Sequence, residues 1–207
     1  TLLFGFDHSF TLNPHLYKSL PYDPIKDFAP ITQLVTFAVP LVANATVGVG
    51  TVPELIQLAR ARPGQLSYGS IGIGSHMHVI TELLKARAGI DLVHVPYKGI
   101  AAMTTALLGG EVQLTWFSIG STRPLVLDKR IKALAYSGTR RSAFMPDLPT
   151  FAEVGYPGVD IGVWYGIFAP ASTPRAIVER IHADIAKLIR DPEYRERLAA
   201  AERTALA

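Results

Sequence analysis

The strongest constraint on the fold is a regular alternation of short apolar strands with helices in the middle of the chain. The extended apolar stretches lie at 66–70, 91–95, 112–117 and 131–137. Short connections between alternating strands and helices favour a parallel sheet covered by helices. Ligands of such sheets lie beyond the carboxyl ends of the strands. We therefore predict an α/β fold with candidate binding residues in the loops after Ser70, Val95 and Phe117.

The ends of the helices carry local signals. Thr51 and Glu54 have the spacing of a capping box, in which each side chain bonds the backbone N–H of the other residue. Ser75 stands at the N-cap of the next helix, and Gly89 stands where that helix stops. The proline-rich stretch 13–30 lacks such signals, so we predict an irregular connection there.

Two further extended stretches, 31–43 and 160–169, flank the alternating region. Strands in these places suit a chain that leaves one lobe, builds a second and returns. We therefore predict a first lobe from 1–43 and 160–207 and a second lobe from 44–159. Because the chain begins in an apolar strand and ends in a helical pattern without a closing element, we expect it to be truncated at both ends.

Composition excludes several classes of protein. The chain has 207 residues with 49% hydrophobic content, which is enough for a substantial core. Its 20 Lys and Arg against 17 Asp and Glu give a net charge of +3, and the basic residues are scattered, so nucleic acid is not expected as a partner. No apolar stretch approaches the roughly 20 residues of a membrane-spanning helix. The absence of cysteine excludes disulfides and thiolate chemistry.

The stretch 68–82, YGSIGIGSHMHVITE, carries most of the candidate chemistry. Gly72 and Gly74 let the backbone bend for close approach to a ligand. Free N–H groups at a helix start, the positive end of its dipole and the Ser75 hydroxyl together suit a carboxylate. The alternative is a plain turn in which Ser75 only caps the helix. A phosphate loop is disfavoured because the lysine of its motif is missing.

Two other kinds of site compete for the same residues. His78 and Glu82 lie one helical turn apart and could chelate a metal ion, but the H-E-x-x-H pattern and a second ligand cluster are missing. Ser75 and His78 could form a hydrolase pair, although no third group to orient the histidine is evident. We therefore predict no catalytic residue, no metal and no cofactor, and keep the hydrolase as the alternative.

Six stretches of the sequence together carry a resemblance that extends over nearly the whole chain. They are NPHLYKSLPYDPIKDFAPI, PGQLSYGSIGIGSHMH, HVPYKG, LLGGEVQL, ALAYSGTRRSAFMPDLPTFAEVGYPG and WYGIFAPASTP. In this order and spacing they resemble the substrate-binding proteins of tripartite tricarboxylate transporters, the Bug family. The resemblance implies a type 2 periplasmic binding protein fold, with two α/β lobes, a hinge and a carboxylate ligand between the lobes.

The same resemblance implies a function and a cellular place. It implies a monomeric periplasmic receptor, not an enzyme, that delivers a small organic acid to the membrane subunits of a tripartite tricarboxylate-type transporter. It also implies that the chain lacks the family's signal peptide, its first strand and glycine-rich loop, and its last helices.

Candidate ligand-binding residues follow from the loop chemistry and from this resemblance. The family's turn is matched from Gly72 to Ser75, and its histidine and glutamate are matched by His78 and Glu82. The full predicted set is Asp7, His8, Ser70, Gly72, Gly74, Ser75, His76, Tyr97, Phe117 and Ser118. Trp164 is a further candidate wall of the site, or else a core residue.

Some of these positions depart from the family's pattern. Phe117 and Ser118 stand where many relatives have an Asp-Asn pair, so a partner for a ligand ammonium group is missing. His76, Asp7 and His8 stand where small polar residues are common. A buried Asp7 would repel a ligand carboxylate unless His8 or a proton compensates. The identity of the acid therefore stays open.

Overall fold

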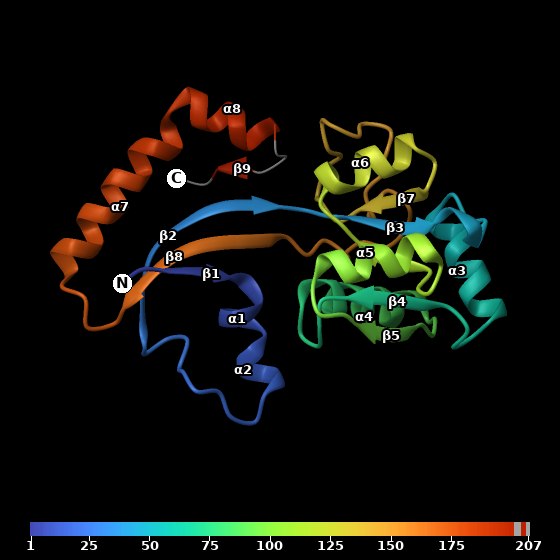
Figure 1. The fold of residues 1–207 in the computed structure, drawn as a ribbon, viewed down its shortest axis with the longest axis horizontal. Coiled ribbons are helices and arrows are strands. Elements are labelled where there is room, and N and C mark those ends of the chain that lie inside the picture. Colours follow the sequence, from blue (N-terminus) through green and yellow to red (C-terminus); the bar gives the residue numbers. More distant parts are fainter. Residues whose placement is uncertain (201–203, 206–207) are drawn as a thin grey trace. The chain divides into compact units, whose positions relative to one another are not determined.

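A computed structural model describes residues 1–200 and 204–205 and divides the chain into two compact units (Figure 1). Unit 1 consists of residues 1–37 and 163–207, and unit 2 of residues 38–162. In the described part of the chain no helix combines the length and apolar character needed to cross a membrane. We expected the chain to end in a helical pattern without a closing element. Part of that stretch, residues 201–203 and 206–207, lies outside the described residues.

Unit 1 is built on an antiparallel sheet with the strand order β1-β8-β2-β9. Its strands are β1 (Leu3–Phe6), β2 (Phe28–Phe37), β8 (Val163–Pro170) and β9 (Thr204–Ala205). Its helices are α1 (Asp7–Thr11), α2 (Asn13–Leu16), α7 (Arg175–Arg190) and α8 (Pro192–Ala200). The long strands β2 and β8 lie side by side and form the centre of the unit, with α7 packed on β2 (Figure 1).

Unit 2 is built on a sheet with the strand order β5-β4-β6-β3-β7. Its strands are β3 (Pro40–Asn44), β4 (Ser67–Ser70), β5 (Val93–Pro96), β6 (Leu114–Trp116) and β7 (Ile131–Tyr136). Its helices are the 3-10 turn η1 (Ala45–Val47), α3 (Val52–Ala61), α4 (His76–Ala88), α5 (Ile100–Gly109) and α6 (Ile119–Leu127). The alternation of strands and helices predicted from the sequence is confirmed in this unit.

The expected parallel pairing is confirmed for β4, β5 and β6, but one strand of this sheet runs the other way. β4 runs parallel to β5 and to β6, whereas β3 runs antiparallel to β6 and to β7. β3 enters the unit directly from β2 and has no crossover helix before it, so the rule for β-α-β units does not apply to it. The carboxyl ends of β4, β5 and β6 still meet at one edge of the sheet.

Side chains on β6 show how the helices cover this sheet. The indole N–H of Trp116 donates to the hydroxyl of Thr81 on α4 at 2.8 Å. The hydroxyl of the preceding residue, Thr115, contacts Sδ of Met103 on α5 at 3.1 Å. Because successive residues of a strand point to opposite faces, α4 and α5 cover opposite faces of the sheet.

Two unit boundaries and one connection differ from those expected. The extended stretch 31–43, expected to be broken by Pro40, is indeed two strands, but β3 pairs with β6 and β7, so residues 38–43 belong to unit 2. Residues 160–162 also belong to unit 2. Strand pairing decides these boundaries, and it depends on residues far away in the sequence. The stretch expected to be irregular contains α2, a one-turn helix too short to give a periodic signal.

The predicted helix ends in unit 2 are confirmed. The Thr51 hydroxyl accepts from the N–H of Glu54 at 3.3 Å, and the Glu54 carboxylate accepts from the N–H of Thr51 at 3.1 Å, which completes the capping box. Ser75 is the N-cap of α4, and Gly89 ends that helix with φ of 61°. A left-handed conformation at this position suits glycine because it has no Cβ.

Thr51→Ala should lower the free energy of unfolding of the chain by about 1 kcal/mol, because the first turn of α3 loses a cap. Thr105→Ala is a matched control, since its exposed hydroxyl bonds only a carbonyl of its own helix, at 3.2 Å. It should leave stability unchanged or slightly raised, because alanine favours helix interiors. Urea unfolding followed by circular dichroism measures both variants. Equal losses in the two would contradict a capping role.

Candidate functional site

The loops that follow β4, β5 and β6 gather at one edge of the unit 2 sheet. These strands are neighbours in the order β5-β4-β6 and run in the same direction. Ser70 ends β4, Tyr97 follows β5, and Ser118 follows β6. The edge therefore collects polar residues that lie far apart in the sequence, as expected for an α/β sheet.

The loop between β4 and α4 is a glycine turn closed by a helix cap. Gly72 and Gly74 have φ of 129° and 80°, conformations that favour glycine. The buried Ser75 hydroxyl donates to the carbonyl of Gly72 at 2.7 Å and accepts from the N–H of His78 at 3.4 Å. The N–H of Ser75 also donates to that carbonyl at 3.2 Å. The predicted turn and cap are both present.

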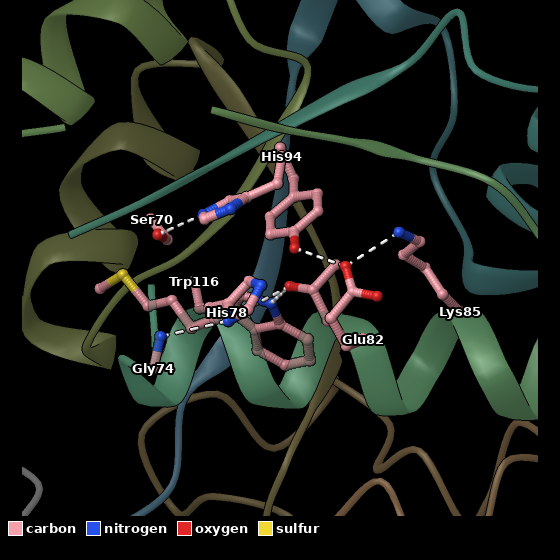
Figure 2. Close-up of polar contacts among 10 residues, drawn as sticks. Ser70, Gly74, His78, Glu82, Lys85, His94 and Trp116 are labelled. Atoms are coloured by element: carbon pink, nitrogen blue, oxygen red, sulfur yellow. Dashed lines mark hydrogen bonds and ion pairs between the residues drawn. The ribbon is translucent and has the colours of Figure 1, made fainter. Parts of the chain in front are cut away.

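Both glycine N–H groups of this loop are held by side chains of the same unit. The N–H of Gly72 donates to Oγ of Ser70 at 3.0 Å. The N–H of Gly74 donates to Nδ1 of His78 at 3.2 Å (Figure 2). These groups fix the backbone of the loop and do not point to an incoming ligand.

The donors left over at the start of α4 are few. Over residues 1–200 and 204–205, the backbone N–H groups of Ile73 and Met77 have no hydrogen-bond partner. The first N–H groups of any helix lack a carbonyl within the helix. Ile73 is 64% exposed, whereas the Met77 side chain is buried. Free N–H groups at the start of a helix are chemically suited to an anion, and the half-buried His76 lies beside these two.

A cluster of polar and aromatic side chains lies between α4 and the sheet (Figure 2). The His94 ring of β5 stacks with both Tyr68 and His78, whose ring centroids lie 4.9 Å and 4.3 Å away. Nε2 of His94 lies 2.7 Å from the Ser70 hydroxyl. Burial lowers the pKa of His94 below its usual value, and the nearby His78 acts in the same direction. The stack is therefore uncharged at His94 near neutral pH.

Glu82 anchors the other end of this cluster. Its Oε1 accepts from the hydroxyl of Tyr68 at 2.7 Å and from Nζ of Lys85 at 2.8 Å. Burial opposes ionisation of Glu82, but the hydrogen bonds from Lys85 and Tyr68 outweigh it, so the pKa of Glu82 lies below its usual range. Burial, together with Glu82, raises the pKa of Tyr68. Glu82 is thus ionised, and its hydrogen bond from Tyr68 links α4 to strand β4.

The geometry does not pair Ser75 with His78 as a hydrolase would require. The Ser75 hydroxyl bonds backbone groups, and the His78 ring faces Gly74 and His94. The close pair is instead Ser70 with His94, which sequence reasoning missed. Ser70 has an exposed fraction of 0%, so its oxygen is not accessible to a substrate. Within the described residues no group of three or more His, Cys, Asp or Glu could hold a metal ion.

The remaining candidates of unit 2 occupy different surroundings. The N–H of Tyr97 donates to the carbonyl of Ser70 at 2.8 Å, and its ring lies beside Gly69 on the face covered by α5. Burial raises the pKa of the Tyr97 hydroxyl. Ser118 is half-buried and caps α6, accepting from the N–H of Ser121 at 3.3 Å. Phe117 is 2% exposed, so its side chain belongs to the core.

Asp7 and His8 lie in unit 1, at the start of α1. Asp7 is 6% exposed, and its Oδ1 lies 3.4 Å from Nδ1 of His8. Among the described residues neither atom has a hydrogen-bond partner.

Trp164 lines a cavity of about 280 Å³ in the same unit, between residues of β2 and β8.

Comparison with known proteins assigns the family. Residues 1–205 match the family described as "Tripartite tricarboxylate transporter family receptor". The chain belongs to this receptor family. A curated relative, the "UPF0065 protein in tcbD-tcbE intergenic region" of Pseudomonas sp. (strain P51), is 38% identical over 183 residues, which are 88% of this chain and 54% of the relative. The chain thus spans about half the length of that relative.

Solved structures agree with this assignment. The R. palustris protein Rpa4515 with adipate is 32% identical, with a TM-score of 0.92 over 99% of this chain and 69% of that one. MatC (Rpa3494) of Rhodopseudomonas palustris with bound malate is 28% identical, with a TM-score of 0.87 over 98% of this chain and 69% of that one. The predicted type 2 periplasmic binding protein fold of this family is confirmed.

In this receptor, Glu82→Gln should lower the free energy of unfolding at neutral pH but not in acid. The pKa of Glu82 is lower in the folded chain than its ordinary value of 4.5, so its contribution is present above pH 4.5 and is lost as the pH falls through the folded value. Urea unfolding of wild type and variant from neutral pH to about pH 3.5 measures the difference.

Glu179→Gln is the control for this experiment. It removes an exposed ion pair with Arg175, and such pairs contribute little to stability. The Glu179 variant should match wild type at every pH. A Glu82 variant whose deficit stays constant into acid would contradict the ionised pairing.

Proposed function

We propose that this chain is the ligand-binding part of a periplasmic receptor that captures a small organic carboxylate and delivers it to a membrane transporter of the tripartite tricarboxylate type. Family membership supports a receptor. Relatives with adipate and with bound malate support an acid as the ligand. On this proposal the protein binds its ligand and releases it unchanged, and needs neither a cofactor nor a metal.

The observation that carries the proposal is the pair of unpartnered donors at the start of α4. Within the described part of the chain, the N–H groups of Ile73 and Met77 have no partner. A carboxylate that approaches the loop can accept hydrogen bonds from both. The positive end of the helix dipole favours the anion without a buried cation. Hydrogen bonds to a charged group contribute roughly 1.5–3 kcal/mol each, so two of them matter to affinity.

The other predicted residues have distinct parts in this proposal. Gly72, Gly74 and Ser75 set the shape of the loop, and His76 stands at its rim. Tyr97 and Ser118 stand in the loops next to it along the sheet edge. The roles of these side chains stay predictions, as do ligand contacts of Ser70, Asp7, His8 and Phe117.

A thermal-shift screen of dicarboxylates, tricarboxylates, aromatic acids and amino acids tests the function. The cognate acid should raise the melting temperature progressively with its concentration, because it binds the folded chain only. Adipate and malate are the first probes. Their diamides are the matched controls, since they keep the shape and lose the charge, and they should give no shift.

Two outcomes of this screen would contradict the proposal. One is equal stabilisation by an acid and its diamide, which would show that the protein does not recognise the carboxylate charge. The other is chemical conversion of a bound compound, detected by NMR of the small molecule. Such conversion would favour the hydrolase alternative.

Variants of the loop test where the acid binds. Ser75→Ala should weaken binding about tenfold or more, because the loop loses the hydroxyl that holds the Gly72 carbonyl. Gly74→Val should weaken it further, because φ of 80° is strained for a branched side chain. Isothermal titration measures both affinities, with thermal melting as the check on folding.

Thr51→Ala is the matched control, since it removes a helix cap of the same kind in α3 and should leave affinity unchanged. If the well-folded Ser75 and Gly74 variants bind the acid as tightly as wild type, the ligand does not bind at this loop.

A further inference from the structure

We propose that His78 is a positioning residue whose neutral imidazole holds the loop from Gly72 to Ser75 in its ligand-binding shape, so that affinity for the acid falls as the solution becomes acidic. The inference rests on the proposed function, because the loop is the candidate ligand site. It adds to that function a residue that acts through the loop and a dependence on pH.

The hydrogen bond between Gly74 and His78 fixes the protonation of the ring. A backbone N–H is always a donor, so Nδ1 of His78, 3.2 Å from the nitrogen of Gly74, must be the acceptor. The ring is then neutral and carries its proton on Nε2. Protonation of Nδ1 would set two N–H groups against each other and break the bond. The loop shape is therefore compatible with only one state of His78.

A second histidine holds the other end of the loop. Nε2 of His94 lies 2.7 Å from the Ser70 hydroxyl, which in turn accepts from the N–H of Gly72 at 3.0 Å. The rings of His94 and His78 stack with centroids 4.3 Å apart (Figure 2). Burial and the neighbouring His78 both lower the pKa of His94 and so favour its neutral form.

The charged and titratable groups around His78 come from three elements. His94 faces the ring from β5, and Tyr68 of β4 stacks in turn with His94. On α4 itself the charged groups are Glu82, which is ionised, and Lys85, which pairs with it at 2.8 Å. Histidine is the side chain that ordinarily changes charge between about pH 5 and pH 8. Acidification within this range is thus the event to which the loop responds.

Loss of the Gly74 bond should lower affinity because the free N–H groups of the loop no longer stand in one fixed arrangement. A neutral hydrogen bond contributes roughly 0.5–1.5 kcal/mol, so we expect binding about fivefold weaker near pH 5 than near pH 8. An imidazolium would also attract the anion, and this effect has the opposite sign. The measured direction of the pH dependence therefore separates positioning from simple charge attraction.

Two variants of the full chain separate the acceptor from the charge. His78→Asn places an amide oxygen near the position of Nδ1, and it cannot be protonated in this range. His78→Phe keeps an aromatic ring against His94 and removes the acceptor. Titration with adipate or malate should give weaker binding in acid for wild type, nearly constant and tight binding for His78→Asn, and weak binding at every pH for His78→Phe. Protonation of the acid itself affects all three chains equally.

A readout without ligand keeps this test independent of the proposed function. Proton–nitrogen NMR spectra should show the Nε2–H tautomer of His78 near pH 8. Hydrogen exchange at the Gly74 amide should be slow in wild type and His78→Asn at that pH, and faster in His78→Phe and in acidified wild type. If this pattern appears and no acid binds, the positioning role stands and the proposed function fails.

Three results would overturn the inference while leaving the receptor function intact. They are the Nδ1–H tautomer of His78, equal exchange of the Gly74 amide in all variants, and pH profiles of affinity that are the same in wild type and His78→Asn. Tighter binding of wild type in acid would likewise overturn it.

Discussion

The packing of α4 against the sheet of unit 2 is the constraint on which the candidate site depends. Trp116 is fully buried in β6, and its indole N–H reaches Thr81 on α4. A buried indole N–H without a partner would cost free energy, so Thr81 must stay within hydrogen-bond distance of Trp116. This requirement fixes the position of α4 on the sheet. The core therefore places α4, and the hydrogen bonds from Gly72 to Ser70 and from Gly74 to His78 hold the glycine loop at its start.

Polar groups between α4 and the sheet complete this support. Tyr68 and Ser70 alternate with Gly69 along β4, so both polar side chains face α4, and Gly69 leaves room for Met103 of α5. A Cβ on Gly69 would lie 2.9 Å from Cγ of Met103. One face of the strand thus carries the hydrogen bonds to the loop, and the other face carries apolar packing.

In the proposed function the acid is held by backbone donors, where other proteins use arginine or lysine. Lys85, a cation further along α4, is engaged with Glu82. A charge buried beside a ligand costs several kcal/mol in desolvation unless it is well paired, whereas N–H groups at a helix start need no such compensation. This choice also explains why sequence signals of charge were uninformative about the ligand.

The sequence by itself determined the local features: the capping box at Thr51 and Glu54, the stop at Gly89, the glycine turn, and the alternation of strands and helices. Each depends on contacts within a few residues, or on a period visible in the chain. Tertiary structure alone decided that β3 runs antiparallel, that Phe117 is buried, and that His94 meets Ser70 and His78. Those facts depend on which strands become neighbours, because pairing energy comes from residues distant in sequence and leaves no local pattern to recognise.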